Sequence, residues 1–369
     1  MDVALRVAVA IAGLLLAGSA VVSAMVTVVL PRAAASKVTR VVFLVMRRAY
    51  LVLAPRSSSY GWRDRVLATY APVGLFATLT AWLGLVFVGF AAAFWAVEDD
   101  GVVAAIEMSG SSLFTLGFAA PTSGPGLWLV FIEAAIGLLL LALLITYLPS
   151  IYSAFSRREV GVTALAVRAG EPPSGREMIW RHWVLGRIDE LHDVWVEWER
   201  WFVDVEETHT SLPALVFLRS PQPDHSWVTA AGAVLDGAAL TVACVDVPRD
   251  VQAEFSIRAG YLCLRRVADF FQIAYDRDPA PDSSISVTRE EWETTLAYLE
   301  EAGVPLKADR DQAWRDFSGW RVNYDAVLVA IADLTTAPPA EWSSDRAGDR
   351  TTPPRTFRPV ARKGQAPGL

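Results

Sequence analysis

The sequence predicts an all-α membrane protein with three transmembrane helices and a short re-entrant helix, followed by a cytoplasmic α-helical domain. Just over half of the residues, 53%, are hydrophobic, and these are concentrated in the first 150 positions. Three apolar runs there, residues 7–30, 71–97 and 127–148, are long enough to cross a hydrocarbon core that requires about 20 residues. The rest of the chain is predicted to form amphipathic helices separated by proline-containing breaks.

The first apolar run is interpreted as a retained span rather than a secretory signal. It is much longer than the roughly 7 to 15 residues of a signal's apolar region. The two cysteines, Cys244 and Cys263, show no metal-ligand or CxxC spacing, so we expect neither a disulfide framework nor a metal site. The net charge of −7 and the absence of a basic face in the second half argue against a nucleic-acid partner.

Basic residues predict the orientation in the membrane. The loop after the first span is rich in lysine and arginine, whereas the loop after the second begins with Glu98, Asp99 and Asp100. Because positive residues remain on the cytoplasmic side, we expect a multi-pass protein of the cell membrane. Its N-terminus would lie outside, residues 31–65 inside, residues 98–126 outside and the domain after Arg158 in the cytoplasm.

The segment at 33–65 is expected to contain a basic amphipathic helix. Lys37, Arg40, Arg47 and Arg48 fall near one face, and several valines and leucines supply apolar contacts. Two interpretations remain open: the helix lies on the anionic inner leaflet, which makes membrane lipid a partner, or it docks on the neighbouring spans.

Within the outer segment 101–126, residues 102–118 are mostly apolar but too few to cross, which favours a helix that enters the bilayer and returns. Irregular backbone at membrane depth is tolerated only where it is packed in protein or lines a water-filled cavity. The residues Ser109-Gly-Ser-Ser-Leu-Phe-Thr-Leu-Gly-Phe118 end this segment. They resemble the pore helix and T-V-G-Y-G filter of potassium channels, with Thr115, Leu116, Gly117 and Phe118 at its first four positions.

The resemblance covers roughly Val66 to Arg158 and implies specific roles. Backbone carbonyls and the threonine hydroxyl at Thr115, Leu116 and Gly117 would replace the hydration shell of a potassium ion, the only ligand that we expect. Phe118 would stand where an aromatic residue wedges the filter open. Two departures are Ala119, in place of the second glycine, and Ala120, where an aspartate usually follows. An alanine resists the left-handed conformation by about 1 to 2 kcal/mol, which puts selectivity for potassium in question.

Other site residues follow from this resemblance and from their position in the spans. Glu133, with Ser109 and Ser112, is expected to support the pore helix, unless the span starts later and Glu133 reaches the headgroups. Gly137 occupies the place of a gating hinge, or else it permits close helix packing. The three outer acids would form a cation-concentrating vestibule, although acids also simply end a span in water.

The second half contains no recognisable nucleotide-binding, calcium-binding or catalytic motif, and we expect no enzymatic activity. Helices are predicted at 175–207, 226–245, 250–277, 288–302 and 308–334. The tryptophan-rich segment 180–201 is interpreted as a core stripe with an acidic outer face, the alternative being a ligand or cation sensor. The sequence does not identify a ligand of this domain.

Together these observations divide the chain into five parts. They are an N-terminal span (1–32), a basic amphipathic segment (33–65), a potassium-channel-like pore module (66–158), a cytoplasmic helical domain (159–335) and a disordered tail (336–369). One pore segment per chain predicts a homotetrameric cation channel, because a closed ring of filter carbonyls requires four copies. The alternative is a non-conducting membrane sensor or scaffold that has kept this fold with a degenerate filter.

Overall fold

The computed structural model describes residues 3–29, 36–55, 59–98 and 100–346. Within these residues the secondary structure is helical, apart from one isolated antiparallel bridge between Val245 and Leu306. The chain forms two compact units, residues 1–155 with 211–218, and residues 156–210 with 219–369. Asp99, most of the predicted tail and the end of the predicted first span lie outside the described residues.

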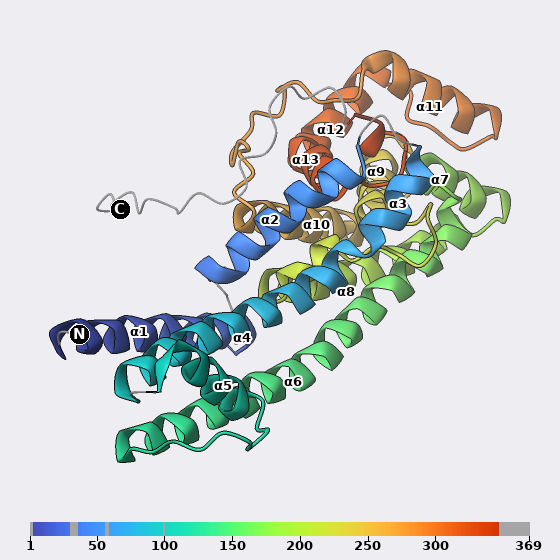
Figure 1. Ribbon diagram of the computed structural model, residues 1–369. Helices are drawn as coiled ribbons and strands as arrows, with labels where there is room; N and C mark the ends of the chain where they lie inside the picture. The colour runs from blue at the N-terminus through green and yellow to red at the C-terminus, as the bar shows by residue number, and fades with distance from the viewer. Residues whose placement is uncertain (1–2, 30–35, 56–58, 99, 347–369) are drawn as a thin grey trace. The chain divides into compact units, whose positions relative to one another are not determined.

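The first unit, which we call the membrane unit, contains the apolar helices of the N-terminal half (Figure 1). Its elements are α1 (Val3–Val28), α2 (Lys37–Leu53), α3 (Tyr60–Ala68), α4 (Tyr70–Val97), α5 (Gly101–Leu113), most of α6 (Gly124–Ala169) and η2 (Pro213–Phe217). Helices α1, α4 and α6 are long and apolar enough to cross a bilayer.

Helices α1 and α4 pack through glycines at their closest approach. A Cβ added to Gly13 would lie 2.3 Å from the carbonyl oxygen of Gly89, and one added to Gly89 would lie 2.4 Å from that of Gly13. Small residues of this kind allow membrane helices to bring their backbones together. Helix α1 is therefore an integral part of this unit, and its buried side chains Ala17, Ala20 and Ala24 join the core formed with α4.

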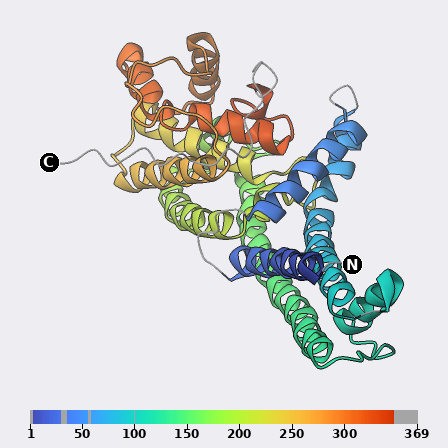
Figure 2. The ribbon, with the colours of Figure 1, turned by 60° about the vertical axis from the view of Figure 1, so that its left-hand side comes forward.

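The short helix α5 lies beside the end of α4 and the first part of α6 (Figures 1 and 2). Its buried residues Ala105, Met108 and Leu113 share a core with Phe90 and Phe94 of α4. With 13 residues, α5 is too short to cross a hydrocarbon core. The chain thus forms a long helix, a short helix, an irregular segment and a second long helix in succession.

The second unit, which we call the helical domain, is built around α9. Its elements are the end of α6, α7 (Gly175–Val184), η1 (Ile188–Glu190), α8 (Leu191–Ser211), α9 (Trp227–Cys244), α10 (Val251–Phe270), α11 (Arg289–Glu301), α12 (Arg310–Arg321), α13 (Asp325–Thr335) and η3 (Ser344–Arg346). Helices α7, α10, α12 and α13 pack against α9. Although α9 is also long and apolar enough to span a membrane, it is buried within this domain along almost its whole length.

Two of the predicted helices are interrupted, and a third ends early. The predicted helix 175–207 is broken after Val184, where Gly186 has a φ of +67°. The predicted helix 250–277 ends at Phe270, just before Gln272 with a φ of +56°. The predicted helix 308–334 is divided between α12 and α13, with Tyr324 completely buried between them.

The start of the predicted tail is also part of the fold. Trp342 is only 5% exposed, and its carbonyl accepts a hydrogen bond from the Arg321 guanidinium. Arg346 forms an ion pair with Glu291 on α11. Residues 336–346 therefore pack with the helical domain and are not a tail, because Trp342 is buried there and Arg346 is paired with Glu291.

Candidate functional site: the segment between α5 and α6

The backbone alternates in conformation directly after α5. Thr115 has a φ of +53° and Gly117 a φ of +72°, whereas Leu116 and Phe118 keep the negative φ usual for L-residues. A threonine with positive φ is uncommon, because its branched side chain crowds the backbone there. The positive φ at Thr115 belongs to the C-cap of α5, where the N–H of Thr115 bonds to the Ser112 carbonyl at 3.0 Å and the N–H of Leu116 bonds to the Ser111 carbonyl at 2.8 Å. The alternation ends at Phe118, because Ala119 does not adopt a positive φ.

Ser111, in the last turn of α5, anchors this segment. Its carbonyl oxygen accepts the backbone N–H of Leu116 at 2.8 Å, and its hydroxyl accepts the N–H of Ala119 at 3.1 Å. One buried residue thus bonds to Leu116 within the tetrapeptide Thr115–Phe118 and to Ala119 directly after it. Ser111 was not predicted to anchor this segment. The available signal was the cluster of serines Ser109, Ser111 and Ser112 in a mostly apolar helix.

Glu133 of α6 is completely buried and lies against α5. The Ser109 hydroxyl donates a hydrogen bond of 2.6 Å to Glu133 Oε1, and it also lies 3.0 Å from the carbonyl oxygen of Phe87 on α4. Ser109 therefore connects all three helices around the segment. Ser112 does not reach Glu133, because its hydroxyl donates to the carbonyl of Met108 within α5.

Gly137 lies one turn further along α6, where α6 crosses the end of α5. A Cβ added to Gly137 would lie 2.3 Å from the carbonyl oxygen of Leu113 and 3.2 Å from its Cδ1. The absence of a side chain thus allows α6 to contact the residue from which the irregular segment starts. This contact supports the packing role of Gly137, whereas the hinge role stays a prediction.

The outer acids occupy different environments. Glu98 is 5% exposed, and its two oxygens accept hydrogen bonds from the backbone N–H groups and the hydroxyls of Thr122 and Ser123. Burial raises the pKa of Glu98, but the hydrogen bonds from Ser123 and Thr122 outweigh it and hold the pKa below its usual value. Glu98 fixes the start of α6, and Asp100 is exposed before α5.

Large apolar side chains of this segment are exposed to solvent in the single chain. Phe114, Leu116 and Phe118 are 54%, 63% and 65% exposed. Contiguous exposed apolar groups of this size usually mark a surface that contacts lipid or another protein. The segment is thus held from one side by α5 and α6 and is open on the other.

The helical domain contains a buried ionic network. The Arg321 guanidinium pairs with Asp236 on α9 and, at 2.9 Å, with Asp325 on α13, and all three side chains are at least 92% buried. Asp325 also accepts hydrogen bonds from the backbone and hydroxyl of Ser286, and Tyr324 donates to Asp236 at 2.8 Å. Each charge in this network has a partner, which indicates a structural role.

A second buried group lies on the part of α6 that belongs to the helical domain. Arg158 pairs with Glu159, and its guanidinium lies 3.2 Å from Nε2 of His209 on α8. Burial, together with the Arg158 charge, holds the pKa of His209 well below its usual value, so that the ring is neutral near pH 7. The indole N–H of Trp201 donates a hydrogen bond of 3.0 Å to the Arg158 carbonyl.

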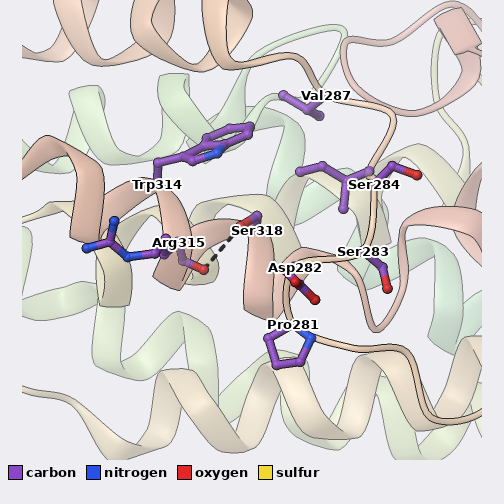
Figure 3. Close-up of a pocket in the computed structure, with 9 residues that line it drawn as sticks. Pro281, Asp282, Ser283, Ser284, Val287, Trp314, Arg315 and Ser318 are labelled. Atoms are coloured by element: carbon purple, nitrogen blue, oxygen red, sulfur yellow. Dashed lines mark hydrogen bonds between the residues drawn. The ribbon is translucent and has the colours of Figure 1, made fainter.

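A cavity of about 410 Å³ lies between the loop 281–287 and α12 (Figure 3). The Trp314 ring and the Val287 side chain line one part of it, and Asp282, Ser283 and Ser318 bring polar groups to another. Arg315 at its edge donates to Gln312, its neighbour on α12. Among the described residues, no group of three or more histidine, cysteine, aspartate or glutamate side chains is placed to hold a metal ion.

The apolar helices of the membrane unit define the class of the protein, which is a helical membrane protein. The chain is similar to the uncharacterized membrane protein YdjJ of Bacillus subtilis (strain 168), with 26% identity over 313 residues, 80% of this chain and 85% of YdjJ. Neither unit alone has that many residues, so the similarity extends into both. No protein-family model matches the chain. No solved structure matches it significantly.

Proposed function

We propose that the protein is a homotetrameric cation channel of the cell membrane that conducts potassium through a filter formed by Thr115–Phe118. The order of the elements carries the proposal: a long apolar helix, the short helix α5, the irregular segment Thr115–Phe118 and a second long apolar helix. A selectivity filter of this type requires consecutive carbonyls to face one ion path. Within the segment, which follows the partly buried helix α5, the sign of φ alternates from Thr115 to Phe118.

The exposure of the segment supports assembly around an axis. The described part of each chain provides one such segment, and a ring of carbonyls closes only when several copies surround it. Phe114, Leu116 and Phe118 would then be covered by neighbouring subunits or by lipid. Chemical cross-linking of the purified protein followed by a count of subunits tests the assembly: a ladder that ends at four is expected, and one that ends at two contradicts a fourfold ring.

Ala119 limits the resemblance to a complete potassium filter. Because the alternation ends at Phe118, the outermost ion site would be altered, and discrimination between potassium and sodium would be weaker. Movement of α6 near Gly137, under the influence of the helical domain, would open and close the path. In this proposal the N-terminus lies outside, and the helical domain lies in the cytoplasm.

Ion flux into liposomes that contain the purified full-length protein tests the proposal. We expect cation uptake by the wild type and its loss in Gly117→Ala, because an alanine at a φ of +72° is strained. Gly101→Ala is the matched control: Gly101 has a φ of +87° and, like Gly117, has no atom near its added Cβ, but it lies outside the filter. Equal losses in both variants, or absence of cation flux in both the wild type and Ala119→Gly, would refute the filter assignment.

The second candidate is a non-conducting membrane sensor or scaffold, and the observation that favours it is the pair Ala119 and Ala120 at the outer end of the segment. Ala119→Gly distinguishes the two functions if the wild type is silent. Selective flux gained by this variant indicates a channel with a degenerate filter. No flux in the variant favours the scaffold, whose output would come from the helical domain.

A further inference from the structure

Helix α2 is fixed along one face between α1 and α4. At its start, the Ser36 hydroxyl lies 2.6 Å from that of Ser23 on α1, and Thr39 lies 3.0 Å from Thr27. The ring of Phe43 lies against Gly74 of α4, where an added Cβ would come within 3.1 Å of it. This face explains why the sequence allowed a helix docked on the neighbouring spans.

The end of α2 is held in the same way. The Tyr50 hydroxyl lies 2.8 Å from that of Thr69, and Tyr70 of α4 donates to the carbonyl of Phe43 at 3.2 Å. Helix α2 is thus held where α1 ends and α4 begins. If α1 and α4 cross the bilayer, as their length and composition allow, α2 lies near the surface at which α1 ends and α4 begins.

Another face of α2 is apolar and uncovered. Val41, Val45 and Val52 are 57%, 59% and 79% exposed. Their spacing of four and seven residues places them in one strip along the helix, away from Phe43 and Tyr50. Valines exposed to this extent are unfavourable in water but stable in the boundary between headgroups and acyl chains.

The edge of this strip is basic. Lys37 and Arg48 are eleven residues apart, which brings them to the same side of the helix beside Val41. Helix α2 contains no acidic residue, and within the described residues no carboxylate pairs with Lys37 or Arg48. Two exposed cations next to an apolar strip match the chemistry of an anionic lipid, which offers a phosphate beside its acyl chains.

We propose that the exposed face of α2 binds anionic phospholipid at the membrane surface. The strip Val41, Val45 and Val52 enters the acyl boundary, and Lys37 and Arg48 contact the headgroup phosphates. This proposal does not depend on ion conduction, because it rests only on the position of α2 at the ends of two spans. It predicts that the protein gathers anionic lipid around this helix in a mixed bilayer.

Fluorescence quenching by brominated lipids tests the proposal. The full-length protein carrying Val45→Cys is labelled with an environment-sensitive fluorophore and reconstituted with brominated phosphatidylglycerol or brominated phosphatidylcholine. The native Cys244 and Cys263 are buried, so we expect them not to react with the fluorophore, and labelling of the wild type measures any background. We expect stronger quenching by phosphatidylglycerol. In a variant that also carries Lys37→Gln and Arg48→Gln, the preference should fall by about fivefold per removed charge.

A matched control removes two positive charges elsewhere. Arg168→Gln and Arg258→Gln change exposed arginines of the helical domain and should leave the lipid preference unchanged. Equal quenching by the two lipids in the protein with Lys37 and Arg48 intact would overturn the proposal. Absence of quenching by either lipid would do the same, because it would place Val45 in water.

Discussion

The contact between Gly137 and the end of α5 leads to a prediction with a defined magnitude. In Gly137→Ala, the new methyl group would lie 2.3 Å from the Leu113 carbonyl oxygen, which belongs to the backbone and cannot rotate away. Overpacking of a well-filled core typically costs 1 to 3 kcal/mol. A contact this short with a rigid group places the cost near the upper limit, about 3 kcal/mol.

Gly84→Ala is the control for this substitution. Gly84 also lies within a long apolar helix, but an added Cβ has no atom within 4 Å. Any general effect of alanine on helix stability is present in both variants, so their difference reports the contact alone. At roughly 2 to 4 °C per kcal/mol for a unit of this size, we expect Gly137→Ala to unfold about 6 to 12 °C below Gly84→Ala.

Thermal unfolding of the purified full-length protein in detergent, followed by near-ultraviolet circular dichroism, measures this difference. If the two variants unfold at the same temperature, the packing argument is wrong. If Gly137→Ala is as stable as Gly84→Ala and also alters ion flux, the hinge interpretation of Gly137 is favoured instead.

Three further predictions concern buried polar groups. Ser109→Ala should destabilise the membrane unit by about 1 to 3 kcal/mol in thermal unfolding, because Glu133 Oε1 loses its donor. Arg321→Met should destabilise the helical domain by about 3 to 5 kcal/mol in the same assay, because Asp236 then remains buried as an unpaired charge. The pH dependence of stability should include a contribution from His209, whose pKa is depressed by burial and by the Arg158 charge. The folded domain keeps the ring neutral, whereas the unfolded chain binds a proton below about pH 6.5. The contribution of His209 to the free energy of unfolding is therefore fully present above that pH. Below it, this free energy falls by at most about 1.4 kcal/mol per pH unit. His209→Gln should flatten this loss between pH 7 and 5 in denaturant unfolding.

Each of these predictions has a result that contradicts it. If Glu133→Gln destabilises the protein as much as Ser109→Ala does, the hydrogen bond between the two residues is not the cause, because an amide can still accept from the serine. Adding Asp236→Asn to Arg321→Met should recover part of the stability, and no recovery would show that lost packing dominates. An unchanged pH profile in His209→Gln would show that the ring is not the titrating group.

Much of the membrane unit was predictable because its signals are local. An apolar run of sufficient length predicts a span wherever its partners lie, and the serines of α5 before Thr115 are visible in the sequence. The pairing of Ser109 with Glu133 was one of the options that the sequence offered, since a buried carboxylate requires a donor. The anchoring role of Ser111 was not predicted, because it depends on the backbone conformation of the segment that follows.

The helical domain was predicted less completely. Its helices were located approximately, but their ends at Val184, Phe270 and Arg321 were placed too late or missed. The pair Asp236 and Arg321 was missed because its members are 85 positions apart, and helical periodicity contains no information about partners at that separation. The available signal was the single carboxylate within the apolar stretch 227–244.

The position of Asp236 also has a consequence for biosynthesis. As α9 leaves the ribosome, it is apolar and long enough to be offered to the membrane-insertion machinery, which samples each segment before the domain has folded. An aspartate near the centre of a segment opposes its insertion by about 2.5 to 3.5 kcal/mol. In the proposed topology, the carboxylate that later meets Arg321 would also favour release of α9 into water and so keep α9 from becoming an additional crossing.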